Sequence, residues 1–405
     1  MKKFNNVKQK CILATLISAT SFSFNAYAET ELNVWWIERE QKPLLEKLDE
    51  ENPNIKLNVR LFSIDELNNE LLKAASTGRN IPDIVQIDNP YHQYFASLGV
   101  LADLNPYIAK SDTIKMEEYF PGPKATVMLD GKAYGLPSTT NSLYLYYNKD
   151  AFKEVGLDPE QPPQTWTQLR EYAEKLTDHS KMRYGLRFSF PQSEEGVFQS
   201  LPWLQMVGAD WNNLEPKAVE ESLGFLKGMI DDRIVSRDSL STGQTAAPFM
   251  SQTTAILVGG PWMIGEISQV DFEWGAAVLP YNEKYNIRSS ALGGINTAIP
   301  AKAENIQAAF ELLEDIRKHQ DVLWNDYGNM SPVATISSNN KNHQEVFEVL
   351  SAQLESAKPR GPHPEWSKIS PILSDMTQRI LTGRTTAEQA AVNAEKRIEK
   401  IVDKS

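Results

Sequence analysis

Strand-like and helix-like patterns alternate from residue 32 to residue 88, and this alternation constrains the fold more than any other feature of the chain. Leu32 to Trp36 and Ile55 to Leu61 have strand patterns, whereas Gln41 to Glu51 and Ile64 to Ser76 carry leucines at helical spacing. A buried strand pattern with a polar end follows at 82–88. Strands and helices that alternate at this pace predict a mainly parallel sheet with crossover helices, and therefore an α/β fold.

Residues 1–28 have the three parts of a secretory signal peptide. Four lysines lie within the first ten residues, an apolar run extends from Cys11 to Phe24, and the segment from Ala26 to Ala28 has the small-x-small form of a cleavage site. The apolar run is shorter than the ~20 residues that span a bilayer. Because Cys11 begins this run, whereas a lipidated cysteine follows the cleavage point, no lipid anchor is expected. We expect export to the periplasm and cleavage after Ala28.

The charge and the cysteine content of the exported chain exclude several classes of function. The full chain has a formal net charge of −12 and one cysteine, and loss of the four lysines and Cys11 with the leader leaves about −16 and no thiol. Disulfides, thiolate metal sites and cysteine nucleophiles are therefore excluded. Because an acidic chain without a stripe of lysines and arginines repels phosphate backbones, no nucleic-acid partner is expected.

The alternating pattern continues to the C-terminus without a linker between two halves. Strand patterns and helical patterns recur, in chain order, at 144–147, 166–176, 221–231, 255–258, 303–318 and 386–401. About 377 residues remain after the leader, which exceeds what one hydrophobic core usually organises. Two domains are therefore expected, and the absence of a linker indicates that the chain crosses between them more than once.

A series of short strings follows a fixed order between about residues 31 and 402. The strings lie at 81–85, 131–137, 145–150, 163–166, 259–262, 279–280, 292–296, 359–369 and 381–386. No single string is specific, since Gly-x-x-Tyr-Gly-x-Pro alone fits any hairpin. In this order, however, they resemble the extracellular solute-binding proteins that deliver sugars to ABC importers, the group that includes maltose-binding protein.

This resemblance implies a two-lobe periplasmic binding protein fold, in which each lobe is a mainly parallel sheet flanked by helices. Two or three crossing segments form the hinge, and the ligand cleft between the lobes shuts by hinge motion. The implied boundaries are 29–138 plus 290–333 for the first lobe and 139–289 plus 334–405 for the second. The crossings are expected near 137–140, 289–292 and 330–335. Open parallel sheets present their ligand-binding loops at the carboxyl ends of the strands, which agrees with such a cleft.

The expected site residues are aromatic and planar polar, because a sugar ring stacks on flat aromatic faces and its hydroxyls bond to amides and carboxylates in pairs. Trp35 and Trp36 end the first strand, and Glu38 follows them. Alternation along a strand turns one of the two indoles into the core, so we expect the other to face the ligand. Asp88 and Asn89 close the 82–88 strand at the matching ligand loop, although Asp88 could instead cap the helix that follows.

A second group of candidates lies beside glycines and near the expected crossings. Trp262 follows two glycines and a proline, which can bring backbone close to a ligand with an indole beside it, and we favour it as the main stacking platform. Gly293 and Gly294 can present bare backbone N–H groups, although hinge geometry would require the same glycines, and Asn296 lies in the same string. Asn141 lies beside the first crossing, where the family places a ligand contact. It is an amide where maltose-binding protein has a carboxylate, which weakens the case for maltose itself.

Three further candidates lie in the expected second lobe. Trp203 flanks a helical segment, and core packing is the alternative for it. Arg360 lies in the proline-punctuated segment 359–364 and Trp366 follows it, and such rigid loops position side chains. Arg360 could bind a pair of hydroxyls or a ligand carboxylate, with an ordinary surface arginine as the alternative.

These observations predict a monomeric periplasmic component of an ABC importer that captures a sugar or oligosaccharide by hinge closure. Its partners would be permease subunits in the inner membrane with a cytoplasmic ATPase. No cofactor or metal is expected, because the five histidines show no metal-ligand spacing. A non-sugar solute such as glycerol phosphate or a polyamine is the alternative, but Lys358 and Arg360 are the only basic candidates for holding a phosphate.

A secreted carbohydrate-active enzyme is the alternative from another functional class. Glycoside hydrolysis needs two carboxylates about 5–10 Å apart, which spacing in sequence neither establishes nor excludes. The chain has no nucleophile elbow, no zinc-protease motif and no phosphate-binding P-loop. We therefore expect binding without catalysis.

Overall fold

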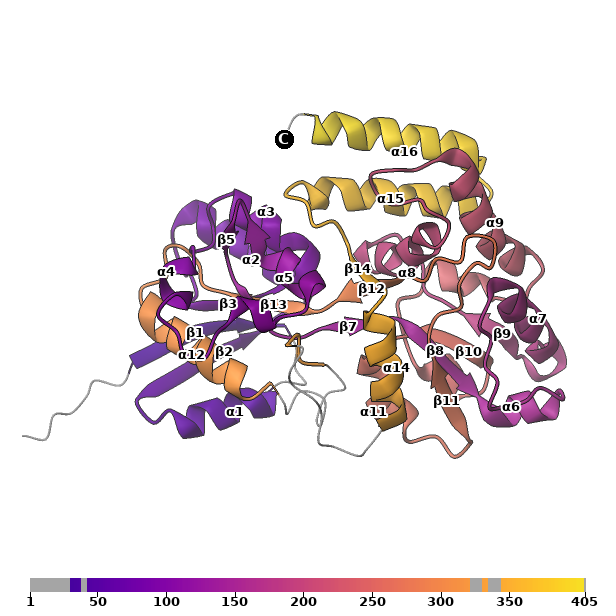
Figure 1. Ribbon diagram of the computed structural model, residues 1–405, viewed down its shortest axis with the longest axis horizontal. Coiled ribbons are helices and arrows are strands. Elements are labelled where there is room, and N and C mark those ends of the chain that lie inside the picture. The colour runs from indigo at the N-terminus through magenta and orange to yellow at the C-terminus, as the bar shows by residue number, and fades with distance from the viewer. Residues whose placement is uncertain (1–29, 38–41, 321–329, 334–343, 404–405) are drawn as a thin grey trace, which may run out of the picture.

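The computed structural model describes residues 30–37, 42–320, 330–333 and 344–403. The predicted signal peptide, Glu38 and residues 334–335 of the third expected crossing lie outside these ranges. Two α/β lobes lie side by side, with a small sheet at their junction (Figure 1). Within the described ranges, no helix has both the length and the apolar character that a bilayer span requires.

The first lobe is built on a five-stranded sheet in which one strand runs against the others. Its order is β2 (Ile55–Leu61), β1 (Thr30–Trp36), β3 (Ile84–Asp88), β13 (Ile295–Ala298) and β6 (Leu136–Pro137). β1 pairs in parallel with β2 and β3, whereas β13 pairs antiparallel with β3 and β6. The reversed strand is therefore β13, which enters the sheet directly from the junction.

Helices cover both faces of this sheet. One face packs against α1 (Lys42–Glu51) and α12 (Ile306–Lys318), and the other against α2 (Ile64–Thr77) and α3 (His92–Ser97). Capping residues set both ends of α2. At its start the backbone N–H of Ser63 donates to Glu66 at 3.0 Å in a capping box, and at its end Gly78 stops the helix with a left-handed φ of +66°. Shorter elements are α4 (Asn105–Ile108), α5 (Pro121–Val127), β4 (Met128–Leu129) and β5 (Lys132–Ala133).

The second lobe has a four-stranded sheet, again with one reversed strand. Its order is β11 (Trp274–Ala277), β8 (Tyr144–Asn148), β10 (Thr254–Gly259) and β9 (Tyr184–Arg187). β8 pairs antiparallel with β10 and β11, while β10 and β9 are parallel. Most strands of both sheets thus share one direction, as predicted. The exceptions are β13 in the first lobe and β8 in the second. Each comes directly after the small junction sheet in the chain, and so enters its lobe from the side that faces the other lobe.

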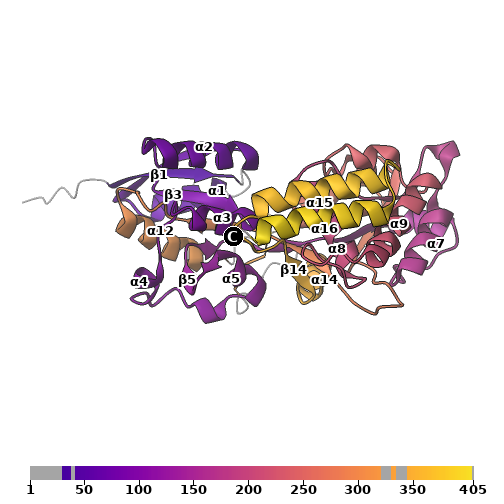
Figure 2. The same cartoon turned by 90° about the horizontal axis from the view of Figure 1, so that it is seen from above.

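One large hydrophobic core joins the long helices of the second lobe to one face of its sheet. They are α7 (Trp166–Leu176), α8 (Glu194–Gln205), α9 (Pro216–Asp231), α15 (Trp366–Leu381) and α16 (Ala387–Val402). The other face packs against α14 (Gln344–Leu354), α10 (Ala247–Met250) and α11 (Ile264–Ile267), and α6 (Lys149–Glu154) follows β8. Figure 2 shows α15 and α16 side by side across this lobe.

A three-stranded sheet lies between the lobes, where the chain passes from one to the other (Figure 1). Its order is β14 (Ala357–Pro359), β12 (Ser290–Gly293) and β7 (Asn141–Ser142). Beside it, Thr140 and Met330 exchange backbone hydrogen bonds of 2.9 and 3.1 Å. Gly294, between β12 and β13, has a φ of +133°, and a Cβ there would lie 2.3 Å from the carbonyl oxygen of Thr139. Only glycine fits this turn without strain.

Candidate functional site at the junction of the lobes

Arg360 connects the two lobes through its side chain. It follows β14, and its Nη2 lies 3.2 Å from Asp88 Oδ1 and 3.3 Å from Asn89 Oδ1, both at the end of β3 in the first lobe. Its Nη1 donates to Glu194 Oε1 at 2.8 Å, at the start of α8 in the second lobe. Arg360 is only 5% exposed, so the alternative of an ordinary surface arginine is wrong.

Glu194 accepts hydrogen bonds from three side chains. Besides Arg360, the indole Nε1 of Trp366 donates to it at 3.1 Å, and the hydroxyl of Ser370 on α15 also donates to it. One turn further along α8, the ring of Phe198 lies below the guanidinium, 4.7 Å from its carbon to the ring centre, as in a cation–π contact. The network is therefore fixed from β3, α8, β14 and α15 together.

The charges in this network balance only in part. Burial disfavours the charge on Arg360, but the carboxylates of Asp88 and Glu194 outweigh this effect and raise its pKa. Burial also raises the pKa of Glu194, against the attraction of Arg360 and the hydrogen bond from Ser370. One guanidinium faces two carboxylates, so the cluster carries a net charge of −1 when all three groups are ionised.

Trp262 lies at the edge of the same cluster. It follows β10 within a short 3₁₀ turn, Pro261–Met263, and at 38% exposure it is the most exposed of the tryptophans that the structure describes. Its ring centre lies 6.1 Å from that of Phe198, whose ring also contacts the guanidinium of Arg360. An exposed indole thus borders the buried charge network through one shared aromatic ring.

The junction sheet adds Asn141 to this neighbourhood. Asn141 pairs with Gly293 between β7 and β12, and its Oδ1 lies 2.1 Å from where a Cβ on Gly293 would be. The ring of Phe198 lies 3.1 Å from the same point, so glycine is needed for this close approach. The backbone N–H of Asn89 donates to the carbonyl of Gly294 at 3.2 Å, which joins the β3 loop to the same turn.

The structure thus gathers eight of the predicted residues around Glu194 and Phe198. They are Asp88, Asn89, Asn141, Trp262, Gly293, Gly294, Arg360 and Trp366. Among the described residues, no group of three or more His, Cys, Asp or Glu side chains could hold a metal ion. The arrangement has an exposed aromatic face at the edge of a buried cluster of amide and carboxylate groups, which are the two kinds of group that bind sugars.

Four predicted residues lie elsewhere, in positions that packing explains. Both faces of β1 are covered by helices, so alternation sends Trp36 into the core with α1 and α12 and Trp35 into the opposite core, 5.1 Å from Phe62 between ring centres. Trp203 is fully buried in the second-lobe core. The amide of Asn296 donates to the hydroxyl of Thr126 at 3.0 Å.

Sequence reasoning missed Glu194, Phe198 and Ser370. A signal for the first two was present: Ser193 precedes two glutamates and an apolar run, which is typical of a helix start. Glu194 and Phe198 are then four residues apart and share one helix face. Ser370 has the same relation to Trp366 on α15.

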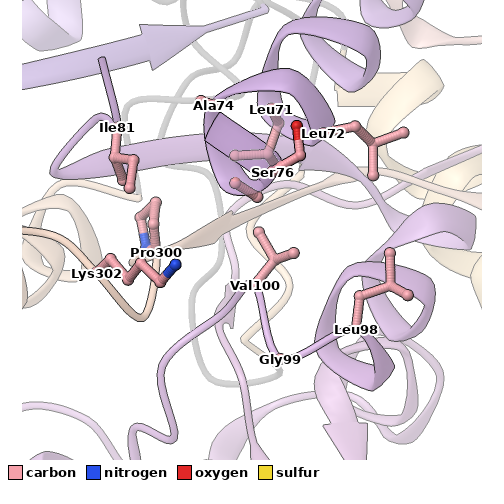
Figure 3. Close-up of a pocket in the computed structure, with 11 residues that line it drawn as sticks. Leu71, Leu72, Ala74, Ser76, Ile81, Leu98, Gly99, Val100, Pro300 and Lys302 are labelled. Carbon is pink, nitrogen blue, oxygen red and sulfur yellow. The ribbon is translucent and has the colours of Figure 1, made fainter. Parts of the chain in front are cut away.

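A separate concavity of about 400 Å³ lies on the first lobe, at the end of the sheet where β13 finishes (Figure 3). Figure 3 shows apolar side chains around it, among them Leu71, Ile81, Val100 and Pro300, with Lys302 at its edge. No carboxylate or amide side chain lines it, so it lacks the paired polar contacts that a saccharide needs.

Comparisons with known proteins agree with the two-lobe fold. The profile of the bacterial extracellular solute-binding protein family matches residues 44–335. The chain is 26% identical over 305 residues, 68% of each chain, to the sn-glycerol-3-phosphate-binding periplasmic protein UgpB of Rhizobium meliloti (strain 1021). The ABC substrate-binding protein Lmo0181 from Listeria monocytogenes, solved with cycloalternan, has a TM-score of 0.80 at 21% identity and covers 93% of this chain and 99% of its own.

A second solved structure gives the same fold. The maltose-bound MalE3 of T. maritima has a TM-score of 0.81 at 20% identity, over 92% of this chain and 100% of its own. The match to the family profile extends over more than half of the chain and includes β3, β8, β10 and the junction strands β7 and β12. The chain therefore belongs to the bacterial extracellular solute-binding protein family.

Proposed function

We propose that this solute-binding protein works in the periplasm as the capture component of an ABC importer, and that its ligand is a neutral sugar or oligosaccharide. The leader at residues 1–28 supports export, and the fold shared with substrate-binding proteins of ABC systems supports transport. The observation that carries the sugar assignment is the exposed indole of Trp262 next to Phe198, whose ring also contacts Arg360, the partner of Asp88 and Asn89.

Glycerol 3-phosphate, the ligand in the name of the curated relative, fits this cluster poorly. A phosphate dianion needs basic donors that are free to approach it. The terminal nitrogens of Arg360 already donate to Asp88, Asn89 and Glu194, and the three charged groups leave a net charge of −1. Lys358, the other basic candidate, is exposed on β14. A neutral polyol avoids this repulsion.

Capture follows from the way the lobes meet. A ligand that contacts the β3 loop of the first lobe and the Trp262 turn of the second has a higher affinity for the closed arrangement, and so shifts the equilibrium toward it. Gly294 and the strands of the junction sheet connect the lobes and would form the hinge. The closed form would then deliver the ligand, chemically unchanged, to the permease.

Trp262→Ala is expected to weaken sugar binding by ~1–3 kcal/mol, because it removes an aromatic platform that no other exposed described tryptophan replaces. Isothermal titration with the sugar that stabilises the wild-type protein measures the loss. Tyr285→Ala is the control, since it truncates a half-buried aromatic residue of the same lobe that lies against Lys284 and Glu221. Unchanged affinity together with a lowered melting temperature would make Trp262 a purely structural residue.

A further inference from the structure

Two buried tyrosines lie directly behind the turn that presents Trp262. Tyr144 and Tyr146, both on β8, are fully buried, and their hydroxyl oxygens are 2.6 Å apart. The hydroxyl of Tyr146 donates to the carbonyl of Gly260 at 3.0 Å. Because Tyr146 gives its proton to Gly260, the proton between the two tyrosines belongs to Tyr144. The pair forms a directed chain that ends on the backbone of the turn.

Gly260 is the residue on which Trp262 rests. A Cβ on Gly260 would lie 2.1 Å from two carbons of the six-membered ring of Trp262, so the indole folds back over this glycine. The carbonyl of Gly260 also accepts the backbone N–H of Met263 at 3.2 Å, the bond that closes the 3₁₀ turn. The carbonyl of Gly260 therefore closes the turn and accepts the hydrogen bond from Tyr146, and the same glycine supports the indole.

Packing alone does not account for these hydroxyls. Phenylalanine would fill the same space among Phe249, Met263 and Ile264, and a hydroxyl taken out of water must find partners or cost free energy. Burial raises the pKa of both tyrosines above the ordinary value, so both stay protonated and able to donate. Tyr146 can accept the hydrogen bond from Tyr144 and still place its own proton, because the carbonyl of Gly260 accepts it.

We propose that Tyr144 and Tyr146 are positioning residues for ligand binding, which fix the Gly260 carbonyl and thereby the plane of the Trp262 ring. The proposal rests on the proposed function in one respect, that Trp262 is the face on which the ligand stacks. Without the hydroxyl chain the turn keeps its bond to Met263 and its connection to β10 but loses the side-chain hydrogen bond that ties the Gly260 carbonyl to β8. The indole then samples several orientations, and a stacked ligand binds more weakly.

Tyr147 provides a matched control on the same strand. Its side chain is on the other face of β8, where it packs against Phe152 at 5.0 Å between ring centres. Its hydroxyl also donates to a backbone carbonyl at 3.0 Å, that of Pro159. Tyr147→Phe therefore removes a hydrogen bond of the same kind and length without touching the Trp262 turn.

The first test needs no ligand. The mature chain, labelled with 5-fluorotryptophan, is measured by ¹⁹F NMR, and the Trp262 resonance is assigned by its loss in Trp262→Phe. Tyr146→Phe should shift, split or broaden this resonance, whereas Tyr147→Phe should leave it unchanged. The resonance of Trp203, which lies in the other core, should be unchanged in both variants. A Trp262 resonance that is identical in the wild type and in Tyr146→Phe would overturn the proposal.

The second test uses maltose and mannobiose as probes in a double-mutant cycle. Tyr146→Phe should bind whichever of these sugars the wild type binds about 3- to 10-fold more weakly. This is the loss expected for one hydrogen bond. In a Trp262→Ala background the same change should have less than a 2-fold effect, because the group it positions is absent. An equal loss in both backgrounds would overturn the proposal. Failure of both sugars to bind would count against the proposed function alone, since the fluorine resonance reports on the ring without ligand.

Discussion

Replacing Arg360 with methionine is expected to lower the free energy of unfolding by ~3–5 kcal/mol, the usual loss when one partner of a buried ion pair is removed. Methionine keeps an apolar stem but takes the guanidinium away from Asp88 and Glu194, whose side chains are only 9% and 15% exposed. Two buried carboxylates are then left near one another without a cation. Urea unfolding followed by circular dichroism measures the change.

Arg187→Met is the matched control for this prediction. Arg187 is buried to a similar degree, at 6% exposure, but its partner Asp238 is 52% exposed and stays hydrated when the arginine is removed. Loss of that pair should cost about 1 kcal/mol or less. Glu194→Gln in the Arg360→Met background should recover part of the larger loss, because it removes one of the two uncompensated charges. Equal losses for the two arginine variants would contradict the description of a buried network.

The second large effect is a loss of stability in acid that depends on His92. The ring is fully buried at the start of α3, and burial lowers its pKa from 6.5 to about 4, opposed only in part by the backbone of Tyr134. Above pH 6.5 the imidazole is neutral in both the folded and the unfolded chain. Between pH 6.5 and about 4 only the unfolded chain binds the proton, so the free energy of unfolding falls by about 3 kcal/mol in total.

Unfolding curves of the wild type and of His92→Gln at pH 7 and pH 5 measure this effect. Acidification to pH 5 should cost the wild type about 2 kcal/mol more than the variant. Burial lowers the pKa of His363 as well, and its contribution has the same sign but is common to both proteins and cancels in the difference. The same loss in both proteins would show that His92 does not cause the acid sensitivity.

Local patterns predicted most helices to within a few residues. The predicted helices 41–51, 64–76 and 386–401 are observed as α1, α2 and α16 with ends shifted by one residue or less. Hydrophobic spacing and capping residues set these ends, and both are visible in the sequence. The helix expected over 221–231 begins earlier, at Pro216, because the side chain of Glu215 accepts the backbone N–H of Ala218 and caps it there.

The direction of individual strands could not be predicted from the same patterns. β13 and β8 look like their neighbours in sequence, but each runs against them. Their direction depends on which end of the sheet the chain enters from, and hence on where it crosses between lobes. The two tryptophans of β1 illustrate the same limit. Alternation separates Trp35 from Trp36, but it does not show that helices cover both faces of the strand.

Resemblance predicted residues that contact one another in the fold better than composition did, because it used the order of distant strings. Asp88 and Arg360 are 272 residues apart in the chain, and only the fold shows that they are in contact. Glu194, which completes the network, lies in no string that the resemblance supplied. Charge compensation in a buried site depends on contacts between side chains from several elements, and such contacts have no signature in a single sequence.

The most direct test of the proposed ligand class is thermal unfolding of a chain that comprises residues 29–405, with neutral mono- and oligosaccharides and, separately, with sn-glycerol 3-phosphate. At a hundred times its dissociation constant, a true ligand should add about 2.7 kcal/mol of stability and raise the melting temperature visibly. We predict that a neutral sugar has this effect and is recovered chemically intact, and that glycerol 3-phosphate has none. Stabilisation by glycerol 3-phosphate with no response to any sugar would contradict the account.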